Sequence, residues 1–144
     1  MKSKIKLLSS SKGLTLIEIL ASITILSIIV VTFLTFFIQS ARTNTVSEDI
    51  MDATYVAQTQ MEEIYNLSKS PYEDAITSLT SKGTHTENNG IDKFQIVNET
   101  YKIQLQLKQT DTNLPNLKDV LVKVYDNSNG RLGAQMETKI SWEN

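Results

Sequence analysis

An uninterrupted apolar run from Ile19 to Ile38 constrains this chain more than any other feature. Its 20 residues include no charged residue, no glycine and no proline. At about 1.5 Å per residue, a helix of this length spans a hydrocarbon core of about 30 Å. A cleavable secretory signal has a shorter apolar core, of about 7–15 residues, followed by a small-residue cleavage site. The residues that leave the run, Gln39 to Arg42, match such a site poorly, so the run predicts a membrane-spanning helix.

The charges on either side of the run predict its orientation. Four lysines precede it within the first 13 residues, whereas Arg42 is the one basic residue among the twenty that follow it. Segments rich in Lys and Arg stay on the cytoplasmic side of a membrane. We therefore expect a single-pass protein with a cytoplasmic N-terminus and with everything beyond about residue 40 outside the membrane.

Charge and residue content disfavour several classes of function. The chain has 14 basic and 16 acidic residues, and four of the lysines precede residue 13, so the remainder is acidic. Phosphate binding rests on clustered Lys and Arg, and an acidic body therefore does not suggest a nucleic-acid binder. The chain has no cysteine and one histidine, His85, which lies in a polar stretch and is expected to be solvated. We expect no enzyme activity, no cofactor and no metal site.

One carboxylate, Glu18, lies at the N-terminal edge of the apolar run. A charge that enters lipid is costly, and it is by default a candidate functional group. A structural interpretation is equally available, because Thr15-x-x-Glu18 fits a capping box with Thr15 as the N-cap. In the first turn the helix dipole also favours a negative charge. The residues alone leave both interpretations open.

A short basic leader ends in Lys12-Gly13, and Leu14-Thr15-Leu16-Ile17-Glu18 then opens the apolar helix. This combination resembles the class III signal of type IV pilins and the related pseudopilins. The resemblance implies that a membrane-embedded prepilin peptidase cuts after Gly13 and that the new N-terminal amine of Leu14 is methylated. It also implies that Glu18 is the carboxylate needed for assembly. Two positions depart from the common pattern: Leu14, where Phe is most frequent, and Thr35, where many major pilins have a proline.

The chain stays compatible with a helix beyond the apolar run. Neither Gly nor Pro occurs between Arg42 and Pro71. Apolar or small residues recur there every third or fourth position, which predicts one helical stripe. We expect a single helix from Leu14 to about Leu67, with its outer half packed on a small head. The stripe consists of Ile50, Ala53, Ala57, Met61, Ile64 and Leu67.

Four segments of the C-terminal part have the pattern of strands, and most of them alternate apolar with polar residues. A period of two predicts an antiparallel sheet with one apolar face packed on the helix. Turn-forming residues separate the segments at Asn98-Glu99 and from Asp126 to Gly130. The four segments are residues 94–97, 101–108, 119–125 and 136–142.

These patterns predict an α+β fold, with a long N-terminal helix that is transmembrane in its first half and packs on a small antiparallel sheet. The resemblance to pilins implies the same fold. Residues 1–13 are expected to be a cleaved basic leader, and residues 14–38 the transmembrane and filament-core helix. The outer half of the helix is expected over 39–70, a surface connection with a short helix over 71–92, and the sheet head over 93–144.

The resemblance implies a structural subunit of a filament that is assembled at the inner membrane of a bacterium. The system would be a type IV pilus, a type II secretion pseudopilus or a competence pseudopilus for DNA uptake. Its implied partners are a prepilin peptidase, other pilin or pseudopilin subunits, membrane lipid and, indirectly, the assembly platform and its ATPase. No direct contact with nucleic acid is expected.

The segment from Ala53 to Ile64 resembles minor pilins of the PilV and I-subunit pseudopilin kind, which suggests a subunit that starts or caps a filament. Two alternatives remain open at this point. In the first, the chain is a major pilin subunit. In the second, it is a single-pass membrane anchor for an external binding domain that is unrelated to filaments.

Overall fold

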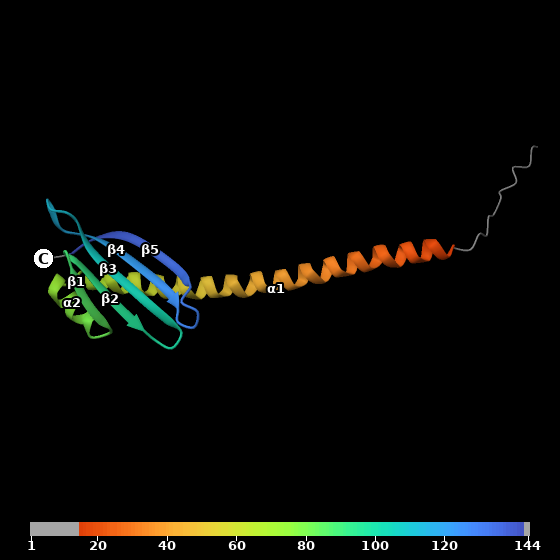
Figure 1. The fold of residues 1–144 in the computed structure, drawn as a ribbon. Coiled ribbons are helices and arrows are strands. Elements are labelled where there is room, and N and C mark those ends of the chain that lie inside the picture. The colour runs from red at the N-terminus through yellow and green to blue at the C-terminus, as the bar shows by residue number, and fades with distance from the viewer. Residues whose placement is uncertain (1–14, 143–144) are drawn as a thin grey trace, which may run out of the picture. The chain divides into compact units, whose positions relative to one another are not determined.

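The structure, a computed structural model, describes residues 15–142 and has a long N-terminal helix and one antiparallel sheet (Figure 1). The α+β fold class predicted from the sequence is therefore confirmed. The chain divides into two compact units, of which the first ends at Thr43 and the second begins at Asn44. In chain order the elements are α1 (Leu16–Leu67), α2 (Tyr72–Thr80), β1 (Thr84–Asn88), β2 (Ile91–Val97), β3 (Tyr101–Asp111), β4 (Leu114–Asp126) and β5 (Leu132–Ser141).

Helix α1 is a single element of 52 residues that ends at Leu67, as the sequence predicted. Its predicted first residue, Leu14, lies outside the described residues. No Gly or Pro occurs within α1, and these are the two residues most unfavourable in a helix interior. Within the described part of the chain, α1 is the one helix that is long and apolar enough to cross a membrane.

The apolar part of α1 contains hydroxyl side chains that bond to the helix itself. Ser22, Thr24, Ser27 and Thr35 each donate a hydrogen bond to the carbonyl oxygen four residues earlier, at 2.7–2.9 Å. A hydroxyl satisfied in this way presents no unpaired donor to an apolar surrounding. These polar residues are therefore compatible with a membrane-spanning helix.

The five strands form one sheet in which each strand pairs antiparallel with its neighbours in sequence (Figure 1). The β1–β2 hairpin closes through Asn89 and Gly90, whose φ angles are 52° and 72°. A two-residue loop with positive φ at both positions favours Asn followed by Gly. The β2–β3 turn is held by Asn98, whose side-chain oxygen accepts hydrogen bonds from the N–H groups of Thr100 and Tyr101 at 3.0 and 2.6 Å. This confirms the turn predicted there.

The structure corrects the prediction for residues 71–92, which are not merely a surface connection. The short helix expected there is present as α2, but β1 occupies residues 84–88 and β2 already begins at Ile91. The sheet head thus begins before residue 93 and has five strands. The prediction failed because β1 is an edge strand whose five residues are all polar, so it lacks an apolar alternation.

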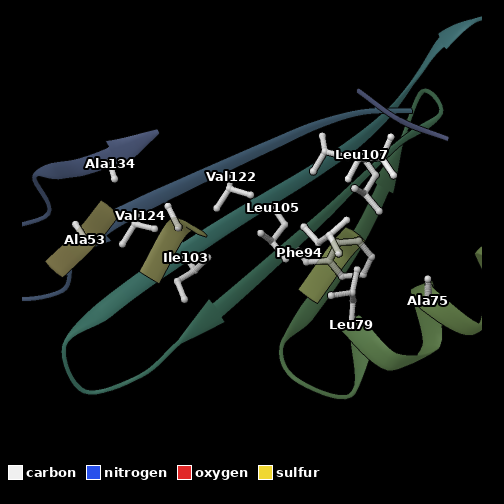
Figure 2. Packing of buried hydrophobic residues seen from close by; sticks show 14 of the residues in the cluster. Ala53, Ala75, Leu79, Phe94, Ile103, Leu105, Leu107, Val122, Val124 and Ala134 are labelled. Carbon is white, nitrogen blue, oxygen red and sulfur yellow. The ribbon is translucent and has the colours of Figure 1, made fainter. Parts of the chain in front are cut away.

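The core lies between the outer part of α1 and the inner face of the sheet, with α2 packed beside it (Figure 2). The alternation predicted for the third and fourth strands is confirmed, because the apolar residues face the helix and the residues between them do not. The buried residues of these two strands are Ile103, Leu105, Leu107, Val120, Val122 and Val124.

The stripe predicted on α1 is confirmed at five of its six positions. Ala53, Ala57 and Ile64 are buried, and Met61 and Leu67 are partly buried against the same core. The stripe as predicted began one turn too early.

Ile50 is the exception, because its side chain is 47% exposed. It lies one turn before Ala53, which is the first buried residue of α1. The helix side that packs on the sheet therefore begins at Ala53.

Helix α1 approaches the sheet closely at a β-bulge in β5. The register of the β4–β5 ladder shifts there, so that Ala134 pairs with Val124 whereas Leu132 pairs with Tyr125, which leaves Gly133 as the extra residue. A Cβ atom placed on Gly133 would lie 2.7 Å from the Cβ of Ala53. Figure 2 shows Ala53 on the side of the sheet where Ala134 and Val124 point. The small residues at both positions permit this contact.

We expect Gly133→Ala to destabilise the head by about 1–3 kcal/mol, because the added methyl overpacks the contact with Ala53. In an Ala53→Gly background the same substitution should cost less, with a coupling of at least about 0.5 kcal/mol. Urea unfolding of the full chain in detergent, followed by the fluorescence of the single tryptophan Trp142, measures all four corners of this cycle. Strictly additive costs would show that Gly133 and Ala53 do not press on each other.

Candidate functional site

The N-terminus of α1 is closed by a reciprocal pair of side chains. The N–H of Thr15 donates to Oε2 of Glu18 at 2.7 Å, and the N–H of Glu18 donates to Oγ1 of Thr15 at 3.3 Å. The hydroxyl of Thr15 also donates to Oε2 of Glu18, at 3.0 Å. Two otherwise unpaired N–H groups are satisfied in this way, which is the geometry of a capping box. The capping box that the sequence predicted between Thr15 and Glu18 is therefore present in the structure.

The capping box does not use the whole carboxylate of Glu18. All three hydrogen bonds involve either Oε2 or the backbone N–H of this residue, and none of the described residues donates to Oε1. Its neighbours Leu16 and Ile17 are apolar and more than 70% exposed. A carboxylate oxygen in such a turn is costly to bury in an apolar surrounding unless a cation meets it. The two roles proposed for Glu18 are thus chemically compatible.

The predicted cleavage position lies outside the described residues. Gly13 and Leu14 precede Thr15, and nothing in the described geometry tests the cut or the methylation. The described part begins two residues after Gly13 and contains Glu18 and the start of α1.

The comparisons with known proteins bear on this N-terminal segment. Residues 8–34 match the prokaryotic N-terminal methylation motif, a stretch that includes Gly13, Leu14 and Glu18. No curated protein and no solved structure matches the chain. This motif at the N-terminus of a pilin-like α+β fold supports a type IV pilin-like protein. It also supports anchoring in the membrane through the hydrophobic N-terminal helix, and it implies processing by a prepilin peptidase and assembly with other pilins.

A second polar cluster, which the sequence did not predict, ties α2 to the first hairpin. The Nε2 atom of His85 lies 2.8 Å from Oδ1 of Asp92, and the hydroxyl of Tyr72 donates to Oδ2 of Asp92 at 2.6 Å. The ring of His85 stacks on Phe94, with 4.5 Å between ring centroids. Burial and the hydrogen bond to Asp92 raise the pKa of Tyr72, so its hydroxyl remains a donor at neutral pH. The cluster is a packing feature of the head.

The expectation that His85 is solvated was therefore wrong. Its side chain is 22% exposed and that of Asp92 is 15% exposed. His85 is the position of β1 that pairs with Phe94, on the face of the sheet that packs against the helices. The signal in the sequence was the Asn89-Gly90 hairpin, which brings His85 and Phe94 into register.

The loop from Asp126 to Gly130 is a turn, as predicted. Oδ1 of Asp126 accepts hydrogen bonds from the N–H and hydroxyl of Ser128 at 2.7 and 2.6 Å, and Oδ2 accepts one from Asn129 at 2.7 Å. These bonds lower the pKa of Asp126 and occupy its carboxylate within its own loop. Arg131 then joins the end of the loop to Asp49 of α1, at 3.2 Å. Among the described residues, no group of three metal-ligating side chains gathers here or elsewhere.

We expect a prepilin peptidase to cut the chain between Gly13 and Leu14, because the methylation motif spans this bond. Co-expression with such a peptidase should shorten the protein by the 13 residues of the basic leader, and intact-mass spectrometry measures this directly. The same spectrum would show methylation of the Leu14 amine. Gly13→Leu is the matched variant, since a bulky side chain before the bond should block cutting. An uncut wild-type chain beside a correctly cut control pilin would contradict the assignment.

Proposed function

We propose that this chain is a minor pilin or pseudopilin, a structural subunit that helps to start or cap a helical filament assembled at the inner membrane. The main support for the proposal is that the methylation motif, the start of the long helix α1 and the carboxylate of Glu18 lie in the same segment of the chain. The methylation motif ends inside a helix of 52 residues whose first turn presents the carboxylate of Glu18. The proposed role is non-catalytic.

Removal of the leader supplies the charge that Glu18 needs. A cut after Gly13 takes away the four leader lysines and frees an amine on Leu14. That amine lies four residues before Glu18, or about 6 Å of helix rise. An ammonium and a carboxylate at the depth of the lipid are each costly when unpaired. We infer that the amine of one subunit pairs with Glu18 of its neighbour, and that this pair sets the register between adjacent helices.

The outer part of α1 favours a filament subunit over an isolated anchor. A span of about 20 residues is enough to hold a domain in a membrane, but α1 continues from Ile38 to Leu67 without a break. Its last part is built into the head core through Ala57 and Ile64. A simple anchor has no need of a helix that joins the membrane segment and the head in one element.

The outer part of α1 also offers a surface for neighbouring subunits. Met51, Tyr55 and Tyr65 are 70%, 71% and 57% exposed. At 100° per residue, Met51 and Tyr55 lie on the side of the helix opposite to Ala53 and Ile64, whereas Tyr65 lies on its flank, about 100° from Ile64. An exposed stripe of Met and Tyr suits contact with another protein. In this proposal the stripe packs against sister subunits, whereas Met61 and Ile64 belong to the chain's own core.

Glu18 variants separate the capping role from the assembly role. Glu18→Gln keeps a side chain that suits a capping box but removes the negative charge. If the charge pairs with the Leu14 amine, this variant should be cut and inserted normally yet be lost from sheared filaments. Quantitative immunoblots of the membrane and filament fractions measure both steps.

Thr15→Val is the matched control for that experiment. It removes the hydroxyl that caps α1, at a cost of about 0.5–2 kcal/mol, and keeps the carboxylate. This variant should still enter filaments. Normal incorporation of Glu18→Gln together with exclusion of Thr15→Val would assign Glu18 to capping alone.

The minor role predicts a low copy number. Deletion of the gene should greatly reduce the number of filaments while the major subunit stays stable in the membrane, because initiation and not subunit supply is affected. Quantitative proteomics of purified filaments should find this chain far below the major subunit. If it were the dominant repeating subunit, the minor assignment would be wrong and the chain would be a major pilin.

A further inference from the structure

The face of the sheet that points away from α1 carries an array of lysines. Side chains alternate along a strand, so the residues between the buried Ile103, Leu105 and Leu107 point to the opposite, outward face. Five lysines and only two acids, Asp119 and Glu137, lie on this face, which we call the lysine face. Its lysines are Lys93, Lys102, Lys108, Lys123 and Lys139.

The acidity of the head is located elsewhere. Residues 44–142 include nine basic and fourteen acidic residues, so that twelve of these acids lie off the lysine face. Five of them are on α1 between Asn44 and Leu67, a stretch without any basic residue. This part of α1 packs behind the sheet, and at physiological salt charges are screened over about 8 Å. The acidic total charge of the chain, from which we expected no binding to nucleic acid, therefore does not represent the charge of the lysine face.

Three lysines of the face are not neutralised. Lys139 pairs with Asp119 at 3.0 Å, and this contact lowers the pKa of Asp119. Within the described residues 15–142, no carboxylate forms an ion pair with Lys93, Lys102 or Lys123. Positive charge is therefore available across strands β2, β3 and β4.

Uncharged polar groups fill the space between these lysines. On β3, Gln104 lies directly opposite Lys123 of β4, and Gln106 lies directly opposite Lys93 of β2. A shallow depression on this face is lined mainly by amides, threonine hydroxyls and Lys93. Its polar lining residues are Thr84, Thr86, Lys93, Gln95, Gln104 and Gln106.

The spacing of the charges suits a phosphate polymer. Lys102 and Lys108 are six residues apart on β3, or about 20 Å, and the lysines extend over four strands, or about 14 Å. Lysine acts as a point charge for phosphate, and amides and hydroxyls hydrogen-bond to phosphate and sugar oxygens. The two-dimensional spread fits the two backbones of a duplex better than one extended strand.

We propose that the lysine face binds double-stranded DNA through its phosphate backbone, without reading its sequence. A lipid surface fits less well, because amides and hydroxyls surround the one apolar side chain at the centre of the described face, Leu121, which pairs with Gln106. The proposal does not depend on the filament role, since it concerns the opposite face of the head.

The test is binding of the full chain, in a neutral detergent, to a fluorescent duplex of about 30 base pairs, measured by anisotropy. We expect a dissociation constant of about 10⁻⁶–10⁻⁴ M at about 50 mM salt, which weakens as salt is added. The double variant Lys102→Gln/Lys123→Gln should bind at least about tenfold more weakly. Its slope of log affinity against log salt should be shallower by about 2, because two phosphate contacts are lost.

The matched control is Lys69→Gln/Lys82→Gln, which changes the net charge equally but lies off the lysine face. It should alter the affinity by less than about twofold, since Lys82 forms only an exposed ion pair, with Glu63. Equal weakening by both double variants, or no binding of wild type at about 50 mM salt, would overturn the proposal. So would capture of phosphatidylglycerol vesicles through Lys102 and Lys123 without binding of DNA. The lysine-face variant should still enter filaments, which separates this test from that of the proposed function.

Discussion

The head depends on one contact, the packing of α1 against the inner face of the sheet. A single sheet has two faces, and the apolar face that carries Leu105 and Val122 needs a cover to leave water. Ala53 is small enough to bring the helix close to β5, and Ala57 and Ile64 are buried in the core further along. The bulge at Gly133 makes room for the same approach. The element that carries the apolar run therefore also covers the core of the head.

Glu18 joins two functions in one side chain. Oε2 closes the first turn of α1 through Thr15, so the helix begins in a defined conformation. Oε1 accepts nothing from the described residues and can receive a cation from outside the chain. Because a capping box holds the carboxylate at the helix start, a partner would meet it with little ordering left to do. The proposed assembly role thus uses the capping interaction and does not replace it.

The sequence predicted the elements in which apolar residues recur at a regular spacing. The length of α1, its stripe from Ala53 onward and the alternation of β3 and β4 all follow from repeated burial of one face. The strand β1 was missed because an all-polar edge strand has no such repeat, and with it the contact between His85 and Asp92. The segregation of charge was missed as well, because total charge carries no information about faces. Only the register of the strands placed Lys93, Lys102 and Lys123 together.

The order of the strands in the sheet has a consequence for how the head is made. Every strand pairs with the one before it in the chain, through hairpins of two to five residues. Each pairing closes only a short loop, so the entropy lost at each step is small and the sheet can form progressively from β1 to β5. The contact between α1 and β5 joins Ala53 to Gly133, which are 80 residues apart in the sequence, so its closure costs more entropy than any of the hairpins. We therefore expect the sheet to add its strands in the order in which they occur in the chain.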